Sequence, residues 1–210
     1  MKFPLHAIRL ALGALACATM LAVAMPVHAQ DGVLSRENVL QDPEIPSLGN
    51  PNGDVTIVEY FDYHCPYCKA VAPELAKLAH EDGKIRIVLK EWPILGADSV
   101  SAARMALAAK YQGKYGEAHH ALMSARGRLT ADRVDQVLAA AGIDVARAKK
   151  DLDSHRKAID ALLARNNAQA EAFGFQASPS FIVGTYRYPG AAPIEHLKQM
   201  VADVRAGKNR

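Results

Sequence analysis

The chain has 210 residues, of which 50% are hydrophobic and 22% are charged, and its formal net charge is +3. This length fits one domain, or one domain with a large insertion, and the composition excludes a wholly disordered or collagen-like chain. The small, unlocalised charge gives no support to nucleic-acid binding. Three cysteines are too few for a disulfide-rich scaffold.

The first 29 residues have the pattern of a cleavable export signal. Lys2 and Arg9 precede an uncharged apolar run at residues 10–25, and residues 27–29 (VHA) offer a small-residue cleavage site. The apolar run is shorter than the ~20 residues that a membrane-spanning helix needs, which favours removal over a retained anchor. We therefore expect a signal peptide at residues 1–29 and a periplasmic location, where disulfides form and persist.

The next part of the chain predicts one parallel strand–helix–strand unit. Residues 30–53 read as a polar leader broken by prolines and glycines, with a short helix around residues 35–40. The β-rich run 54–61 predicts a strand buried on both faces, and the amphipathic run 65–82 predicts a helix. The run 84–92 predicts a second strand. Connections this short make the unit parallel and right-handed.

Residues 97–173 differ from this unit because they are alanine-rich and helical in pattern throughout. Four helices are expected there: Asp98 or Ser99 caps the first, Thr130 caps the third, and Asp144 begins the fourth. Strand patterns return at residues 180–183 and 185–188, as a hairpin, and an amphipathic helix ends the chain. The element order is therefore β-α-β, then helices, then β-β-α.

Cys65 and Cys68, in the run Cys65-Pro66-Tyr67-Cys68, are the only cysteines of residues 30–210. A C-x-x-C pair at a strand-to-helix junction is typical of a dithiol–disulfide couple. Unpaired N–H groups at the helix N-terminus lower the pKa of Cys65, which makes it the expected nucleophile and Cys68 the more buried resolving thiol. A structural disulfide closing so short a loop adds little stability. A structural zinc site needs four ligands, so no bound metal is expected.

The segment 61–69 (FDYHCPYCK) resembles the active-site segment of the DsbA-like thioredoxin-fold thiol:disulfide oxidoreductases. The preceding segment 49–59 (GNPNGDVTIVE) is similar to the Com1/ScsC-type branch of that family. The resemblance covers residues 37–205 and implies an α/β thioredoxin fold (β-α-β … β-β-α) with an inserted all-helical domain. The implied parts are a thioredoxin-like domain at residues 54–96 and 174–210 and a helical insertion at residues 97–173.

The resemblance also implies roles for residues near the cysteine pair. Ser178 and Pro179 match the family's cis-proline loop, which faces the dithiol and pairs with substrate backbone. Glu59 matches the family's buried acid. Burial would raise the pKa of its carboxyl, which can then exchange a proton with Cys68. The alternative is that Glu59 is a solvated residue at the strand edge.

Two more residues flank the nucleophile. His64 would stabilise the Cys65 thiolate when protonated, and the alternative is an exposed loop histidine. Tyr67 lies between the cysteines, where relatives tune the redox poise, and it is expected with Pro66 to contact substrate.

Three nearby residues have expected structural roles. Asp62 is expected to cap the loop, Lys69 to be a solvated charge on the helix, and Trp92 to lie in the core.

The expected function is that of a periplasmic thiol:disulfide oxidoreductase that forms, reduces or isomerises disulfides through a reversible Cys65–Cys68 disulfide. The direction stays open at this point. The expected partners are exported client proteins and a membrane redox partner that resets the pair, with no cofactor and no nucleic acid. A monomer is expected because the leader is short for an oligomerisation stalk. The alternative function is a thiol-based copper-binding or chaperone-like protein, since thiolates suit Cu(I).

Overall fold

A five-stranded mixed β-sheet lies at the centre of the molecule, in the strand order β1-β3-β2-β4-β5. The computed structural model describes residues 32–208, so the expected signal peptide at residues 1–29 lies outside the described residues. The strands are β1 (Ser47–Gly49), β2 (Val55–Phe61), β3 (Ile85–Glu91), β4 (Ser180–Val183) and β5 (Tyr186–Pro189).

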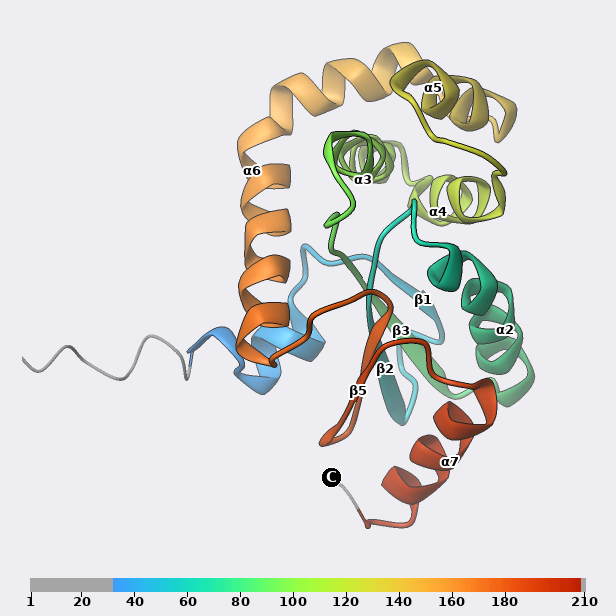
Figure 1. Cartoon of the computed structure of the whole chain (residues 1–210), viewed down its shortest axis with the longest axis vertical. Helices are drawn as coiled ribbons and strands as arrows, with labels where there is room; N and C mark the ends of the chain where they lie inside the picture. The colour runs from blue at the N-terminus through green and yellow to red at the C-terminus, as the bar shows by residue number, and fades with distance from the viewer. Residues whose placement is uncertain (1–31, 209–210) are drawn as a thin grey trace, which may run out of the picture.

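Strands β2 and β3 run parallel in the middle of the sheet, and α2 (Pro66–Asp82) connects them. Six of the seven residues of each strand are buried, which fits strands that are covered on both faces. Helices α2 and α7 (Ile194–Arg205) cover one face, and η1 (Glu37–Gln41) with the second half of α6 (Val145–Ala172) covers the other (Figure 1). The predicted parallel unit is confirmed.

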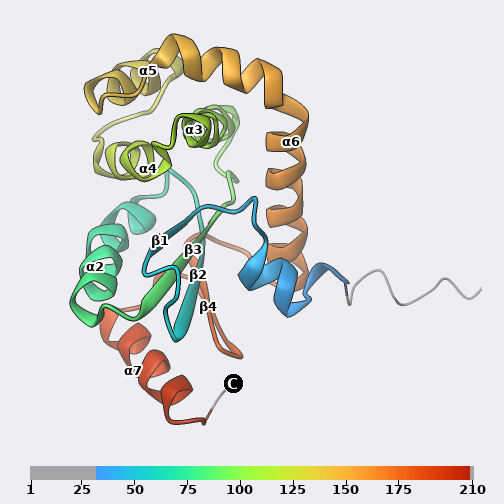
Figure 2. The ribbon, with the colours of Figure 1, turned by 180° about the vertical axis from the view of Figure 1, so that it is seen from behind.

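The four helices expected after this unit are all present. They are α3 (Ala97–Ala109), followed by the short turn η2 (Lys110–Gln112), then α4 (Tyr115–Ser124), α5 (Ala131–Ala140) and α6. Thr130 and Asp144 lie at the starts of α5 and α6 as predicted, and their side chains accept hydrogen bonds from backbone N–H groups in the first turns. The predicted cap at Asp98 or Ser99 is wrong, because α3 begins at Ala97 and its N-cap is Gly96, which has no side chain to accept a hydrogen bond. Helix α6 packs along α3 and then continues beside β3, so that one helix ties the inserted helices to the sheet (Figure 2).

The C-terminal part completes the sheet as predicted. Strand β4 pairs antiparallel with β2, and β4 and β5 form an antiparallel hairpin before α7. The chain therefore has the expected α/β architecture, a thioredoxin-type order of elements interrupted by helices. Within residues 32–208, no helix combines the length and the apolar character needed to cross a membrane.

Strand β1 is the element that the sequence pattern does not predict. It lies at the edge of the sheet, antiparallel to β3, with Leu48 opposite Ile87. Three residues are too few to show the alternation by which a strand is found in sequence, so the leader reads as polar coil. The short helix expected around residues 35–40 is present as the single π-helical turn η1, whose Val39 is buried.

The turn before β2 lies close to the backbone at the start of β3, and a substitution in this turn tests that close approach. A Cβ atom at Gly53 would lie 2.6 Å from the Lys84 carbonyl oxygen and 2.7 Å from the Arg86 nitrogen, both of them backbone atoms. We therefore expect Gly53→Ala to lower the free energy of unfolding by roughly 1–3 kcal/mol, measured by urea denaturation. Gly116→Ala is the matched control, because its Cβ would meet only the Leu48 side chain, at 3.3 Å. Equal unfolding free energies for the two variants would contradict the close approach.

Candidate active site

Cys65 and Cys68 lie at the N-terminus of α2, directly after the carboxyl end of β2. Cys65 is the N-cap residue, and its sulfur accepts a hydrogen bond from the Cys68 backbone N–H at 3.4 Å. Pro66 occupies the first helical position, where its missing N–H costs nothing. Both cysteines are free thiols in this structure, so it represents the reduced state of the pair.

The two thiols differ in exposure and in pKa. The pKa of Cys65 is lowered to about 6 by the hydrogen bond from the Cys68 thiol, against partial burial, with help from the backbone N–H of Cys68 and from the side chain of Ser178. Cys68 is fully buried, whereas Cys65 keeps 4% exposure. Burial, followed by the hydrogen bond to Cys65 and the charge of Glu59, raises the pKa of Cys68 far above its ordinary value. The pair therefore combines one thiol that ionises readily with one that holds its proton.

Glu59 lies on β2 beneath the cysteine pair and is 1% exposed. Burial, and then the charge of Cys65, raises the pKa of its carboxyl to about 8. Its register partners on the neighbouring strands are Leu89 and Phe181, which are apolar and offer no compensating charge. The expectation of a buried acid with a raised pKa is confirmed, and the alternative of a solvated edge residue is excluded.

The Ser178–Pro179 loop faces the thiol of Cys65. The Ser178–Pro179 peptide bond is cis, as the resemblance implies. The Cys65 thiol donates to the Ser178 carbonyl oxygen at 3.2 Å, which brings together two segments that lie 113 residues apart in sequence. Tyr67, in contrast, is 64% exposed and projects from the surface beside the pair.

His64 connects the active-site turn to the inserted helices. Its Nε2 accepts a hydrogen bond from the Leu129 backbone N–H at 3.2 Å, and its Nδ1 lies 3.1 Å from the Ser99 hydroxyl oxygen. Because a backbone N–H can only donate, the proton of the neutral ring is on Nδ1. Among the described residues, no hydrogen bond or ion pair joins His64 to Cys65. Stabilisation of the Cys65 thiolate by a protonated His64 stays a prediction.

Asp62 holds the turn as predicted. Its carboxylate accepts from the backbone N–H of His64 at 2.7 Å and of Leu95 at 2.9 Å, so it joins the active-site turn to the loop after β3. Trp92 is buried, as expected of a core residue, and its Nε1 donates to Asn167 on α6.

The expectation for Lys69 is wrong. Its side chain is half-buried instead of solvated, and its Nζ donates to the carbonyl oxygens of Leu122 at 3.0 Å and Ala125 at 2.6 Å. These carbonyls end helix α4, where a cation is favourable. The sequence gives no signal for this contact because the acceptors are backbone atoms more than 50 residues away.

A buried polar cluster behind the turn is also absent from the sequence-based expectations. Glu91 is fully buried, its pKa is raised to about 8 by burial, and its Oε1 accepts from the Tyr115 hydroxyl at 2.6 Å. The Tyr63 hydroxyl lies 3.3 Å from Nδ1 of His119. Burial, and then the charge of His120, lowers the pKa of His119 to about 3, so its ring is neutral. The sequence signal for this cluster is Glu91 itself, a charged residue near the end of the run 84–92 that is predicted to be a strand.

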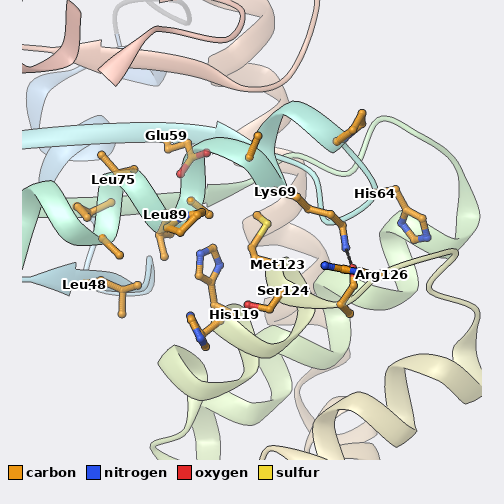
Figure 3. Close-up of a pocket in the computed structure, with 18 of the residues that line it drawn as sticks. Leu48, Glu59, His64, Lys69, Leu75, Leu89, His119, Met123, Ser124 and Arg126 are labelled. Atoms are coloured by element: carbon orange, nitrogen blue, oxygen red, sulfur yellow. Dashed lines mark hydrogen bonds between the residues drawn. The ribbon is translucent and has the colours of Figure 1, made fainter. Parts of the chain in front are cut away.

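A cavity of about 610 Å³ opens between α2 and α4 (Figure 3). Leu75, Leu89 and Met123 are among the apolar side chains that line it. Buried Glu59 belongs to its inner wall, whereas exposed Arg126 belongs to its rim. The cavity thus gives the buried acid beneath the cysteines a route toward the surface.

Comparisons with known proteins agree with this geometry. The family model described as "Thioredoxin" matches residues 41–203. A thioredoxin-like oxidoreductase from Silicibacter pomeroyi has 40% identity and a TM-score of 0.78, covering 81% of this chain and 98% of that one. The thiol-disulfide exchange protein alpha-DsbA2 from Wolbachia pipientis has 27% identity and a TM-score of 0.76, covering 83% and 95%. A periplasmic thioredoxin-like protein from Salmonella enterica serovar Typhimurium has 29% identity and a TM-score of 0.69, covering 81% and 95%.

The curated relatives are longer proteins, and the chain spans about a quarter of their length. An Na(+)/H(+) antiporter NhaA 1 from Salinispora arenicola is 30% identical over 176 residues, which cover 79% of this chain and 26% of the relative. The family match extends over most of the chain and includes the sheet, the cysteine pair and the inserted helices. The chain therefore belongs to the thioredoxin family.

Proposed function

We propose that the chain exchanges disulfides with exported proteins in the periplasm, with Cys65 as the nucleophile and Cys68 as the resolving thiol. The observation that carries the proposal is the contrast between the two thiols. The pKa of Cys65, at the helix N-cap, is lowered to about 6, while burial raises the pKa of Cys68, one turn further on. A thiolate is the attacking species in thiol–disulfide exchange, so this contrast supports the two proposed roles.

The forward reaction begins from the Cys65–Cys68 disulfide. A client thiolate attacks the Cys65 sulfur, the Cys65–Cys68 bond breaks, and Cys68 leaves with the electron pair and takes a proton from Glu59. A second client thiolate then attacks the client sulfur of the mixed disulfide. The client gains a disulfide, and Cys65 leaves as a thiolate. Two electrons thus move from the client to the cysteine pair.

The lowered pKa of Cys65 favours this direction. Stabilising the thiolate stabilises the reduced pair, which makes the disulfide form a stronger oxidant. We therefore propose that the chain donates its disulfide to clients. A membrane redox partner then reoxidises the pair without a bound cofactor in this chain.

The client binds beside the Cys65 sulfur, next to the exposed residues that separate the two cysteines. Ser178 lies next to the Cys65 sulfur and can pair its backbone with an extended client segment by strand addition. Pro66 and Tyr67 are both exposed and border the same sulfur, so they are placed to contact the client. The apolar run at residues 10–25 supports the proposed export to the periplasm. We also propose that the chain acts as a monomer.

Replacing one cysteine at a time tests the assignment of roles. Cys68→Ser is expected to accumulate mixed disulfides between Cys65 and client proteins in cells, because the resolving thiol is gone. Cys65→Ser is expected to trap none, because the remaining thiol is buried and holds its proton. The measurement is a non-reducing gel after acid quenching. Equal trapping by the two variants, or trapping by Cys65→Ser alone, would overturn the assignment.

The direction is tested by the redox state of the unsubstituted protein in the same quenched cells. A donor of disulfides is expected to be mostly oxidised, as measured by the mass added on thiol alkylation. A mostly reduced pair would show that the chain instead reduces or isomerises client disulfides.

Glu59 is tested by the pH dependence of the step in which Cys68 releases a labelled peptide from a mixed disulfide with Cys65. This step needs a base, and in the reduced protein burial, with a smaller contribution from the charge of Cys65, raises the pKa of the Glu59 carboxyl to about 8. Cys65 carries no charge in the mixed disulfide, so the release rate of the wild-type protein is expected to rise as the pH increases from the ordinary glutamate range toward 8. Glu59→Gln should slow release roughly a hundredfold and abolish the rise. The control is the alkylation of Cys65 by iodoacetamide in the reduced form of both proteins. Identical release profiles for the wild-type and Glu59→Gln proteins would exclude Glu59 as the proton carrier.

A further inference from the structure

The cavity between α2 and α4 contains a polar atom that the described chain leaves without a partner. Glu59 Oε1 is buried and accepts no hydrogen bond within residues 32–208, although Glu59 lines the cavity. The cavity therefore extends from the surface to the carboxyl that we propose as the proton carrier for Cys68. Ser178 and Pro179 do not line the cavity, whereas His64 and Pro66 of the active-site turn do.

The rim of the cavity is basic. The Lys69 ammonium donates to two carbonyl oxygens and has a third N–H, while the exposed Arg126 has no hydrogen bond or ion pair with any residue from 32 to 208. Glu59 is the only acid among the described residues of the lining, and it lies buried at the inner wall. Figure 3 shows Lys69 and Arg126 close together and away from Glu59. The charges therefore suit one anionic group at the rim and an uncharged body inside.

We propose that this cavity is a binding site for a small amphipathic monoanion, namely an aliphatic chain that ends in one carboxylate. The carboxylate lies beside Lys69 and Arg126. The chain lies against Leu75, Leu89 and Met123, and its far end covers Glu59. A cavity of about 610 Å³ is within the usual range for small-molecule sites. Its lining also includes the buried His119, whose ring is neutral, and the exposed His120.

Binding here has a consequence that depends on the proposed function. An apolar chain against Glu59 excludes water from the carboxyl, which stabilises its protonated form. The proton exchange with Cys68 would then slow, and the bound monoanion would lower the rate at which the pair is resolved.

Decanoate is the probe, and decanol is its uncharged counterpart. By isothermal titration calorimetry on the reduced, unsubstituted protein, decanoate is expected to bind with one molecule per chain and about fivefold more tightly than decanol. Arg126→Ala should weaken decanoate binding by roughly threefold to fivefold, the range of an exposed ion pair, and leave decanol binding unchanged. No saturable decanoate binding, or an equal effect of Arg126→Ala on both ligands, would overturn the proposal.

A second pair of variants locates the site. Ala72 lines the cavity from α2, so Ala72→Phe should fill it and weaken binding of both ligands more than tenfold. Ala161→Phe, at an exposed position of α6 outside the lining, is the matched control and should bind both ligands normally. Thermal unfolding checks that both variants fold, and wild-type affinity in folded Ala72→Phe would place the site elsewhere. Because binding is measured without any exchange reaction, these results are independent of the proposed function.

Discussion

The sulfur of Cys65 lies where a capping side chain lies in other helices, next to the free N–H groups that begin α2. Those N–H groups have no partner in the helix itself, and they favour an anion over a neutral thiol. Pro66 removes one competing donor from the first turn, and the Cys68 N–H is left to point at the sulfur. Any change that turns the sulfur of Cys65 away from the helix axis would remove both its acidity and its value as a leaving group.

The turn that presents Cys65 is held from three sides. Asp62 bonds the turn to the loop after β3, His64 bonds it to Ser99 and Leu129 of the insertion, and Lys69 caps the end of α4 from the next turn of α2. The inserted helices therefore do more than cover the sheet. They hold the cysteine turn through these contacts, and they leave the cavity that Glu59 lines between α2 and α4.

Long, strongly patterned elements of this fold could be predicted from the sequence, and short or long-range features could not. The apolar run of β2, the amphipathic run of α2 and the caps Thr130 and Asp144 each carry a local signal, and each element was found. Strand β1, with three residues, is too short to carry a local sequence signal. Lys69 reads as a surface charge because its acceptors are backbone atoms of a distant helix. Glu91 is buried by α4 and α6, whose positions no local pattern contains.

The central claim is that the hydrogen bond from the Cys68 thiol, together with the backbone N–H groups that begin α2, holds Cys65 as a thiolate. The most direct test is the pH titration of thiolate ultraviolet absorbance in the reduced protein. One transition is expected, with a midpoint near the pKa of about 6, and Cys65→Ser should remove it. Cys68 should add no transition in the same range, since burial raises its pKa. A wild-type midpoint near the ordinary cysteine value of 9.0, or a transition that survives in Cys65→Ser, would contradict this account.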